Sequence, residues 1–293
     1  TLNDYSAPGE QRITHNLFRE GPPLIAKAPS GNLLAAWIGP EGIMVSEYNP
    51  IQAAWGQPSV IPGTDDHNYG LQDLALAFDG QGNVIAIWSA MDISSLGPES
   101  TSEEIRAAFE TGGDLMFARW DQSSGTWSTP TVLAASPGAE GHVRVQRLST
   151  GQILATWLVP ADENGASVLR AAFWNPADAT WSLPVDLVTE TIIDAPSIGE
   201  INGHPILVWT AGVVSEGTTR YVLRSTTLEE TNWVPPQDVT IALASSSVSS
   251  ISTTTDSSTE LTPALFTSRF PFIDPPEECC KCKEWEKIEN KIV

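Results

Sequence analysis

Tryptophan recurs along this chain at a fixed distance from glycine, and this repeat restricts the fold more than any other feature of the sequence. In each copy a glycine lies six residues before the tryptophan, in the pairs Gly31/Trp37, Gly82/Trp88, Gly151/Trp157 and Gly203/Trp209. The copies follow one another at intervals of about fifty residues, with a longer interval between the second and the third. A repeat of this length predicts one supersecondary unit that is stacked several times.

A second landmark follows the first in each copy. A tryptophan lies seven residues after a tyrosine, tryptophan or threonine and three residues before a proline, in the sets Tyr48/Trp55/Pro58, Trp120/Trp127/Pro130, Trp174/Trp181/Pro184 and Thr226/Trp233/Pro236. Short β-rich runs alternate with Gly, Pro and Asn turns around these landmarks. Each copy therefore predicts a four-stranded antiparallel meander, and the whole chain predicts an all-β β-propeller.

The number of blades follows from the number of copies. Four copies are complete, and residues 240–275 hold part of a fifth, in which Phe266 stands in place of the tryptophan. A short run at residues 12–17 would add an outer strand to the last blade, because a closed ring removes open sheet edges. We expect five blades within residues 1–274, with six as the alternative, and a separate tail at residues 275–293.

Each repeated residue type has a structural role in such a blade. We expect Trp37, Trp88, Trp157 and Trp209 to pack between neighbouring blades, and the glycine before each one to occupy a turn with positive φ. Asn49, Asp121 and Asn175 begin the turns before the second landmark, with Thr227 in the divergent fourth copy. Asn and Asp side chains bond readily to the backbone of such turns.

The second copy carries an insertion at about residues 89–113. Within it, residues 101–104 read Thr-Ser-Glu-Glu, which is the pattern of a capping box at the start of a helix. We therefore expect a short helix on a long loop. Such a loop either carries function or is an inert elaboration of the scaffold.

Composition excludes several classes of partner. The net charge of −21 argues against binding to nucleic acid and against docking on an anionic membrane, since both need clustered cations. The chain has no apolar run of about twenty residues, so we expect no membrane span. No sequence motif points to a cofactor. The acidic, Lys-poor and Ser/Thr-rich repeats favour an extracellular or cell-surface location.

The last residues differ from the repeats. All three cysteines, Cys279, Cys280 and Cys282, lie there, followed by an apolar stripe of Trp285, Ile288 and Ile292. The spacing of the stripe predicts a helix that packs either on copies of itself in a coiled coil or on a continuation of the chain. The cysteines favour disulfides between chains over a zinc site, because the second half of a zinc motif is missing.

The turn that reads Asp-Gln-Ser-Ser-Gly-Thr-Trp at residues 121–127 resembles the Asp-box repeat of sialidase-type β-propellers, whose pattern is S-x-D-x-G-x-T-W. Residues 175–181 are a weaker copy. The spacing differs from the pattern in two ways. The separation from Asp121 to Gly125 is longer than the Asp–Gly separation of the pattern, and the separation from Gly125 to Trp127 is shorter than its Gly–Trp separation. The resemblance covers residues 22–240 and implies a propeller in which these turns are structural and lie away from the catalytic face.

A sialidase-like site would need three converging arginines, but Arg119, Arg170 and Arg224 fall on the third strands of the expected blades. The innermost strands would carry Lys27, Asp73, Arg144 and Glu200. Asp73 and Glu200 could form the carboxylate pair of a glycosidase, although we favour a structural role for both. The four histidines lack the spacing of metal ligands, and we expect them on surfaces or turns: His15, His67, His142 and His204.

Three functions fit these observations. The sequence favours a non-enzymatic propeller that acts as a structural or binding head and self-associates through its tail, with a glycan or a surface protein as a further partner. The first alternative is a sialidase-like glycoside hydrolase. The second is a lectin that binds carbohydrate in the grooves between blades.

Overall fold

The computed structural model describes residues 22–28, 30–66, 69–96, 100–101, 103–104, 113–161, 165–215 and 218–239. Every element with defined bounds in these ranges is a β-strand, and neighbouring strands pair antiparallel. The predicted all-β fold is therefore confirmed, and the strands form the blades of a β-propeller. Each complete repeat of the sequence makes one blade.

The first two blades each pair three long strands with shorter outer ones. Blade 1 contains β1 (Leu24–Lys27), β2 (Leu33–Gly39), β3 (Gly42–Asn49), β4 (Ala54–Trp55) and β5 (Ser59–Val60). Blade 2 contains β6 (Tyr69–Phe78), β7 (Val84–Asp92), β8 (Gly113–Asp121), β9 (Thr126–Trp127) and β10 (Thr131–Ala134). In both blades the third long strand pairs with two short outer strands, because the turn that carries the second landmark interrupts the outer edge.

The third and fourth blades repeat this plan. Blade 3 contains β11 (Gly141–Arg147), β12 (Ile153–Pro160), β13 (Ser167–Asn175), β14 (Thr180–Trp181) and β15 (Val185–Ile192). Blade 4 contains β16 (Ser197–Ile201), β17 (His204–Ser215), β18 (Thr218–Glu229), β19 (Asn232–Trp233) and β20 (Gln237–Asp238). The end of β15 also pairs with β17, and this pairing joins the two blades into one continuous sheet.

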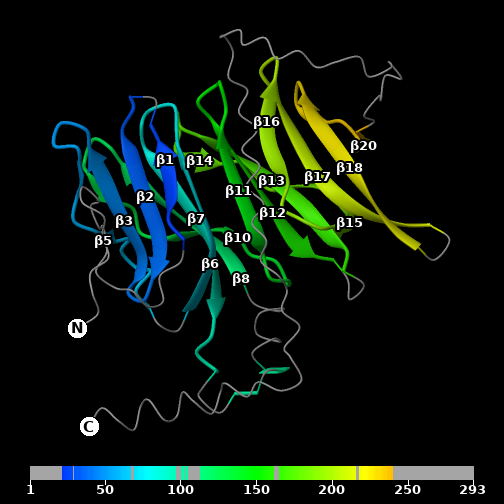
Figure 1. Ribbon diagram of the computed structural model, residues 1–293, viewed down its shortest axis with the longest axis horizontal. Coiled ribbons are helices and arrows are strands. Elements are labelled where there is room, and N and C mark those ends of the chain that lie inside the picture. Colours follow the sequence, from blue (N-terminus) through cyan, green and yellow to red (C-terminus); the bar gives the residue numbers. More distant parts are fainter. Residues whose placement is uncertain are drawn as a thin grey trace, which may run out of the picture. The chain divides into compact units, whose positions relative to one another are not determined.

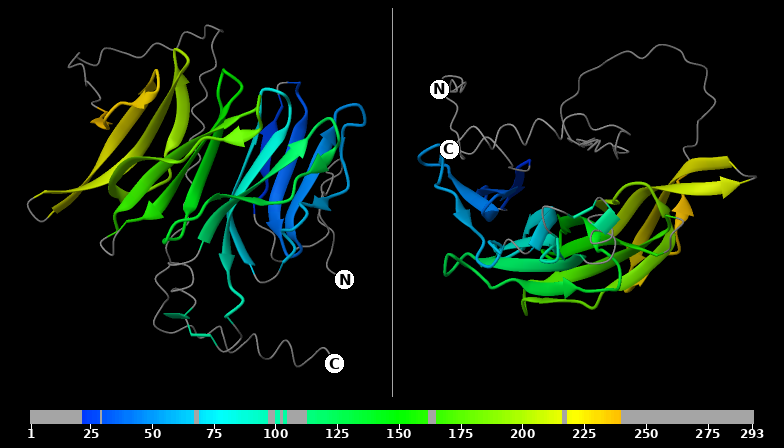
Figure 2. Two further views of the ribbon diagram at one scale, coloured as in Figure 1. Left: turned by 180° about the vertical axis from the view of Figure 1, so that it is seen from behind. Right: turned by 90° about the horizontal axis from the view of Figure 1, so that it is seen from below.

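The four blades follow one another in sequence order (Figures 1 and 2). Their first strands lie side by side: β1 contacts β6, β6 contacts β11, and β11 contacts β16. The first strand of each blade is therefore the innermost, as in a propeller. The blade number of five stays a prediction, because residues 1–21 and 240–274, which would supply the closing blade, lie outside the described part of the chain.

Three apolar clusters fill the spaces between consecutive blades. The predicted packing between blades is confirmed for three of the four tryptophans of the first landmark, because Trp88 lies in the cluster between blades 1 and 2, Trp157 between blades 2 and 3, and Trp209 between blades 3 and 4. Trp37 is buried as well. Each of the three clustered tryptophans faces the preceding blade, and strand alternation fixes this direction for the whole row of side chains on that face.

The turns also match the sequence pattern. Gly31, Gly82, Gly151 and Gly203 all have positive φ, between +80° and +94°. The side chains of Asn49, Asp121 and Asn175 each accept a hydrogen bond from a backbone N–H of the turn that they begin. Both predictions for the turns are therefore confirmed, apart from Thr227, for which no such bond is found among the described residues.

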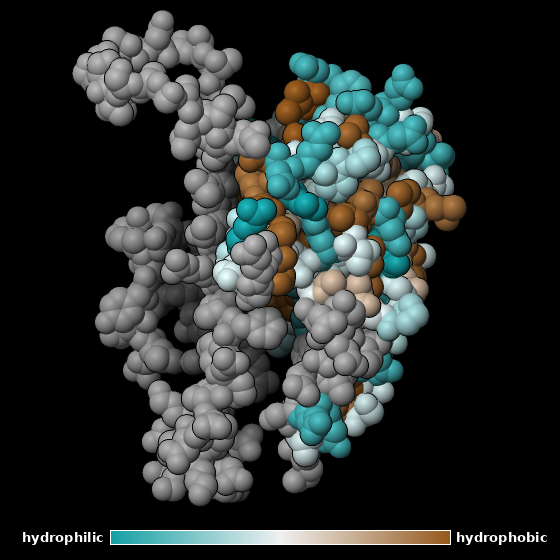
Figure 3. All heavy atoms as spheres, turned by 90° about the vertical axis from the view of Figure 1, so that its right-hand side faces the viewer, coloured by the Kyte–Doolittle hydropathy of each residue, from teal (hydrophilic) through white to brown (hydrophobic). Residues whose placement is uncertain are grey.

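One face of blade 4 has exposed apolar side chains. Tyr221 and Leu223 on β18, Val214 on β17 and Ile201 on β16 are exposed, and Tyr221 by 66%. Figure 3 shows this side of the molecule, where apolar residues lie among hydrophilic ones. A further blade would cover this face, since the side of β18 that carries Val222 already packs against blade 3.

The insertion in blade 2 begins a helix where the sequence predicts one. The backbone N–H and the hydroxyl of Thr101 donate hydrogen bonds to the Glu104 carboxylate, and the Thr101 oxygen accepts one from the Glu104 N–H. This is the geometry of a capping box. The two bonds from Thr101 hold the pKa of Glu104 below its ordinary value. Residues 105–112 and the tail with Cys279, Cys280, Cys282, Trp285, Ile288 and Ile292 lie outside the described residues.

Candidate active site

The candidate site lies at the end of the blades where the innermost strands begin. Tyr69, the first residue of β6, pairs with Asp92, the last residue of β7, and the insertion at residues 93–112 follows directly. The start of β11 lies next to β6. Antiparallel pairing therefore places the insertion of blade 2 at the same end of the blades as the first residues of β6 and β11.

Asp73 on β6 and His142 on β11 form the most unusual feature of this end. Both have positive φ, 51° and 56°, which non-glycine residues rarely adopt. Each interrupts the register of its strand with the next, so each marks a β-bulge. The Asp73 carboxylate accepts a hydrogen bond of 2.8 Å from the backbone N–H of His142.

This contact depends on the glycine before His142. A Cβ atom at Gly141 would lie 2.9 Å from the Asp73 Oδ2 atom, closer than a side chain there allows. Glycine therefore lets the carboxylate reach the His142 backbone. The left-handed backbone conformation costs about 1–2 kcal/mol of folding free energy for each non-glycine residue. Two such residues in contact therefore mark a place where the surrounding structure fixes the direction of their side chains. Both side chains are exposed.

A buried carboxylate lies two residues before His142 in the chain. Glu140 has only 1% of its surface exposed, and it accepts hydrogen bonds from Ser136 at 2.6 Å and from Arg170 at 3.3 Å. Arg170 also binds Asp186 at 2.6 Å. The Glu140 backbone N–H bonds to the Gly113 carbonyl, the first residue after the insertion. Glu140 thus fixes the start of β11 to the start of β8, and its charge is neutralised by the guanidinium.

Asp73 and Glu200 do not form a carboxylate pair. Glu200 accepts hydrogen bonds from the backbone N–H and the hydroxyl of Ser149, in the turn that follows β11. Asp73 contacts His142, at the opposite end of β11. The seven residues of β11 span roughly 20 Å at about 3.3 Å per residue, which is more than the separation of the two carboxylates in a glycosidase. Each carboxylate instead bonds a neighbouring blade.

The arginines are placed as the sequence predicts. Arg119, Arg170 and Arg224 lie on the third strands β8, β13 and β18. Each is held in ion pairs. Arg119 binds Asp121. Arg170 binds Glu140 and Asp186. Arg224 binds Glu190 and Asp238. They do not converge on the innermost strands, so among the described residues they do not form the arginine cluster that binds an anionic sugar.

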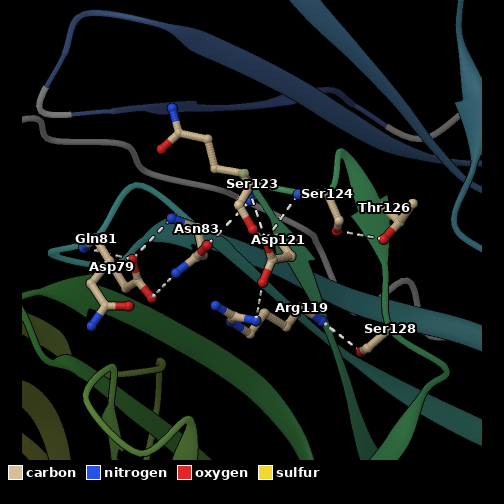
Figure 4. A network of polar contacts seen from close by, with 10 residues as sticks. Asp79, Gln81, Asn83, Arg119, Asp121, Ser123, Ser124, Thr126 and Ser128 are labelled. Atoms are coloured by element: carbon tan, nitrogen blue, oxygen red, sulfur yellow. Dashed lines mark hydrogen bonds and ion pairs between the residues drawn. The ribbon is translucent and has the colours of Figure 1, made fainter.

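The opposite end of blade 2 holds a polar network that is structural (Figure 4). The buried Asp79 carboxylate accepts bonds from the backbone of Gln81 and Asn83, and the Asn83 amide oxygen accepts one from the Gln122 N–H. This links the turn before β7 to the turn after β8. Hydrogen bonds from Ser123, followed by Ser124 and Arg119, hold the pKa of Asp121 far below its ordinary value.

Within the described ranges, no three His, Cys, Asp or Glu side chains come together as metal ligands. His204 shares a hydrogen bond with the Leu228 carbonyl, and His142 lies at the bulge described above. His15 and His67 are outside the described residues. No helical segment of the described chain has the length and hydropathy that a membrane span needs.

The fold is similar to that of several solved structures, at low sequence identity. One is an α-L-arabinanase from Penicillium chrysogenum, complexed with arabinobiose (TM-score 0.53, 16% identity, covering 78% of this chain and 68% of that chain). Another is an intramolecular trans-sialidase from Ruminococcus gnavus (TM-score 0.52, 10% identity, 76% and 71%). A third is a protein of unknown function from Dyadobacter fermentans (TM-score 0.51, 10% identity, 74% and 68%). No family model and no curated protein sequence matches the chain.

These matches correct the function that the sequence favoured. The arabinanase and the trans-sialidase are enzymes that share this fold, so the preference for a non-enzymatic structural or binding head is contradicted, and the glycosidase alternative is the better supported one. The sequence also missed the Asp73–His142 contact, because the two residues are 69 positions apart. The glycine before His142 was the available signal, but a single glycine does not reveal its partner.

Proposed function

We propose that this protein is a glycoside hydrolase that acts on neutral glycans, with its active site at the end of the propeller where the innermost strands begin. The observation that carries this proposal is the exposed Asp73 carboxylate, held at a bulge of an innermost strand by the His142 N–H at 2.8 Å. β-Bulges next to active sites direct side chains toward a substrate. The likeness in fold to the arabinanase and the trans-sialidase supports the same reaction class.

Asp73 would supply one of the two carboxylates that glycoside hydrolysis uses. As an exposed carboxylate it can act as the nucleophile or as the base that activates water. Glu140 is a poor second candidate, because it is buried and bound to Arg170. We assign Glu140 the role of positioning the strand that carries His142.

The substrate is proposed to be neutral on electrostatic grounds. The chain has a net charge of −21, so it repels an anionic sugar at long range. The three third-strand arginines are already bound to carboxylates of this chain. A sialic acid substrate would therefore find no free arginine cluster among the described inner strands.

A relationship to the Asp-box turns of sialidase-type propellers is part of the proposal. In blade 2 the Asp121 carboxylate accepts bonds from Ser123 and Ser124, while Trp127 packs on Trp120 with ring centroids 5.7 Å apart. Blade 3 repeats the tryptophan contact between Trp174 and Trp181 at 5.6 Å. The turns lie away from the proposed active site, as the resemblance implies.

The test is a hydrolysis assay on a panel of neutral aryl glycosides and oligosaccharides, with a sialoside included. We expect turnover of at least one neutral substrate, and Asp73→Asn should lower kcat/KM by about 10²–10⁴-fold. Asparagine keeps an oxygen that can accept the His142 bond, so the fold should persist. Glu200→Gln is the matched control, because it changes an inner-strand carboxylate at the other end of the blades.

Three outcomes would contradict the proposal. They are no turnover of any substrate in the panel, an equal loss of kcat/KM in Glu200→Gln and Asp73→Asn, or turnover of the sialoside alone. The last would retain a hydrolase but exclude the neutral substrate class.

A further inference from the structure

The described surface has a groove between blades 3 and 4, at the end of the blades opposite to Asp73. Its volume is about 570 Å³, within the range of small-molecule sites. One wall is the segment from Ser182 to Leu187, which follows the outer turn of blade 3. The other wall is the outer turn of blade 4, with Thr231, Asn232 and Trp233.

The lining combines aromatic and apolar surface with polar groups. Phe173 stacks on Trp233 at a ring-centroid distance of 6.4 Å, with 25° between the planes. Leu183 is 87% exposed beside them, and Val185 is half exposed. Thr231 and Asn232 are exposed, and their side chains have no hydrogen-bond partner among the described residues. A sugar ring offers the matching chemistry, since its C–H face packs on apolar side chains while its hydroxyls bond to amides and hydroxyls.

The repeat itself provides an internal comparison. Phe173 stands directly before a landmark aromatic residue, where blade 2 has Arg119 and blade 1 has Glu47. Leu183 stands two residues after the second landmark, where blade 2 has Thr129 and blade 1 has Gln57. The same scaffold therefore carries charged or polar side chains at these positions in blades 1 and 2, and apolar ones in blade 3. The repeat pattern by itself therefore does not require apolar side chains at these two positions.

We infer that the groove between blades 3 and 4 is a second, non-catalytic carbohydrate-binding site that takes a neutral oligosaccharide. Leu183 and the Phe173–Trp233 pair would pack against a sugar ring, and Asn232 and Thr231 would bond its hydroxyls. Asp186 at the rim is already bound to Arg170, so its charge is balanced. The site would hold a glycan while the opposite end of the propeller acts on it, yet binding there does not depend on hydrolysis.

The test is calorimetric titration with arabinotriose, xylotriose and maltotriose in the Asp73→Asn background, so that no probe is consumed. At least one probe should bind, and Leu183→Thr combined with Asn232→Ala should weaken its affinity by about tenfold or more. Leu183→Thr gives blade 3 the residue that blade 2 already has, so folding should be unaffected. Ile51→Thr, at an exposed turn position of blade 1, is the control and should bind as the parent does.

Failure of this inference is distinguishable from failure of the proposed hydrolase activity. If no probe binds, or if the double variant binds as tightly as the parent, the groove is not a glycan site. If the double variant loses binding, and the protein that retains Asp73 hydrolyses no substrate, the groove is a glycan site and the hydrolase proposal is wrong. Hydrolysis of a small aryl glycoside should be the same with and without the groove substitutions.

Discussion

Arg224 on β18 binds Glu190 on β15 at 2.5 Å, and this ion pair joins blade 4 to blade 3. Arg224 is the cross-strand neighbour of Trp209 and of Asp238. The same three cross-strand positions hold Trp157, Arg170 and Asp186 in blade 3. They hold Trp88, Met116 and Val132 in blade 2, and Trp37, Met44 and Val60 in blade 1. One repeat position thus holds an apolar pair in two blades and an ion pair in the other two.

Replacing the arginine of this row by the methionine of the other blades should destabilise the protein. Arg224→Met leaves Glu190, which is largely buried, without its cation, at a cost of about 2 kcal/mol. Arg224→Met combined with Glu190→Gln should recover part of the loss. Urea denaturation measures both, with Arg220→Met on the exposed part of β18 as the control. Equal stability of Arg224→Met and the control would show that the pair does not hold the blades together.

The turns between the third and outer strands contain a position that favours glycine. Gly125 occupies it in blade 2 with φ 67°, but Ala179 in blade 3 and Ala53 in blade 1 adopt the same conformation. We expect Ala179→Gly to stabilise the protein by about 0.5–1 kcal/mol and Gly125→Ala to destabilise it by about 1 kcal/mol. Opposite signs in thermal unfolding would confirm the turn geometry. A loss of stability in both variants would contradict it.

The Asp121 turn predicts a specific pH dependence. Its pKa is far below the ordinary value of 3.8 in the folded protein, chiefly through the Ser123 hydroxyl. The turn therefore contributes its full stability above pH 3.8 and loses it as the pH falls below that value toward the folded pKa. The stability difference between the parent and Asp121→Asn should narrow below about pH 4. Ser123→Ala should raise the pKa of Asp121, as followed by carboxyl carbon NMR, and an unchanged titration would reject this account.

The tail remains a sequence-based proposal. Cys279, Cys280 and Cys282 precede an apolar stripe, and in an oxidising, extracellular setting we expect them to link chains through disulfides. Non-reducing electrophoresis of the chain produced under oxidising conditions should show ladders that collapse on reduction and are absent when all three cysteines are replaced by serine. A monomer band under oxidising conditions, or zinc bound in equal amount to the chain, would overturn this expectation.

Sequence alone determined the blades, because their formation depends on local features that recur. The glycines at the inner turns, the Asn and Asp residues at the outer turns and the alternation around Trp88, Trp157 and Trp209 each act within one copy or between adjacent copies. The repeat therefore predicted the strand order and the inter-blade packing. The number of blades stays a prediction.

Tertiary structure decided which residues meet at the proposed active site. Asp73 meets His142, and Glu140 meets Arg170, only because consecutive blades bring their strands side by side. The same packing separates Asp73 from Glu200 by the length of β11 and places Leu183 beside Trp233. A linear pattern gives the direction of each side chain relative to its own strand, but the distance between two strands of different blades depends on how whole sheets pack.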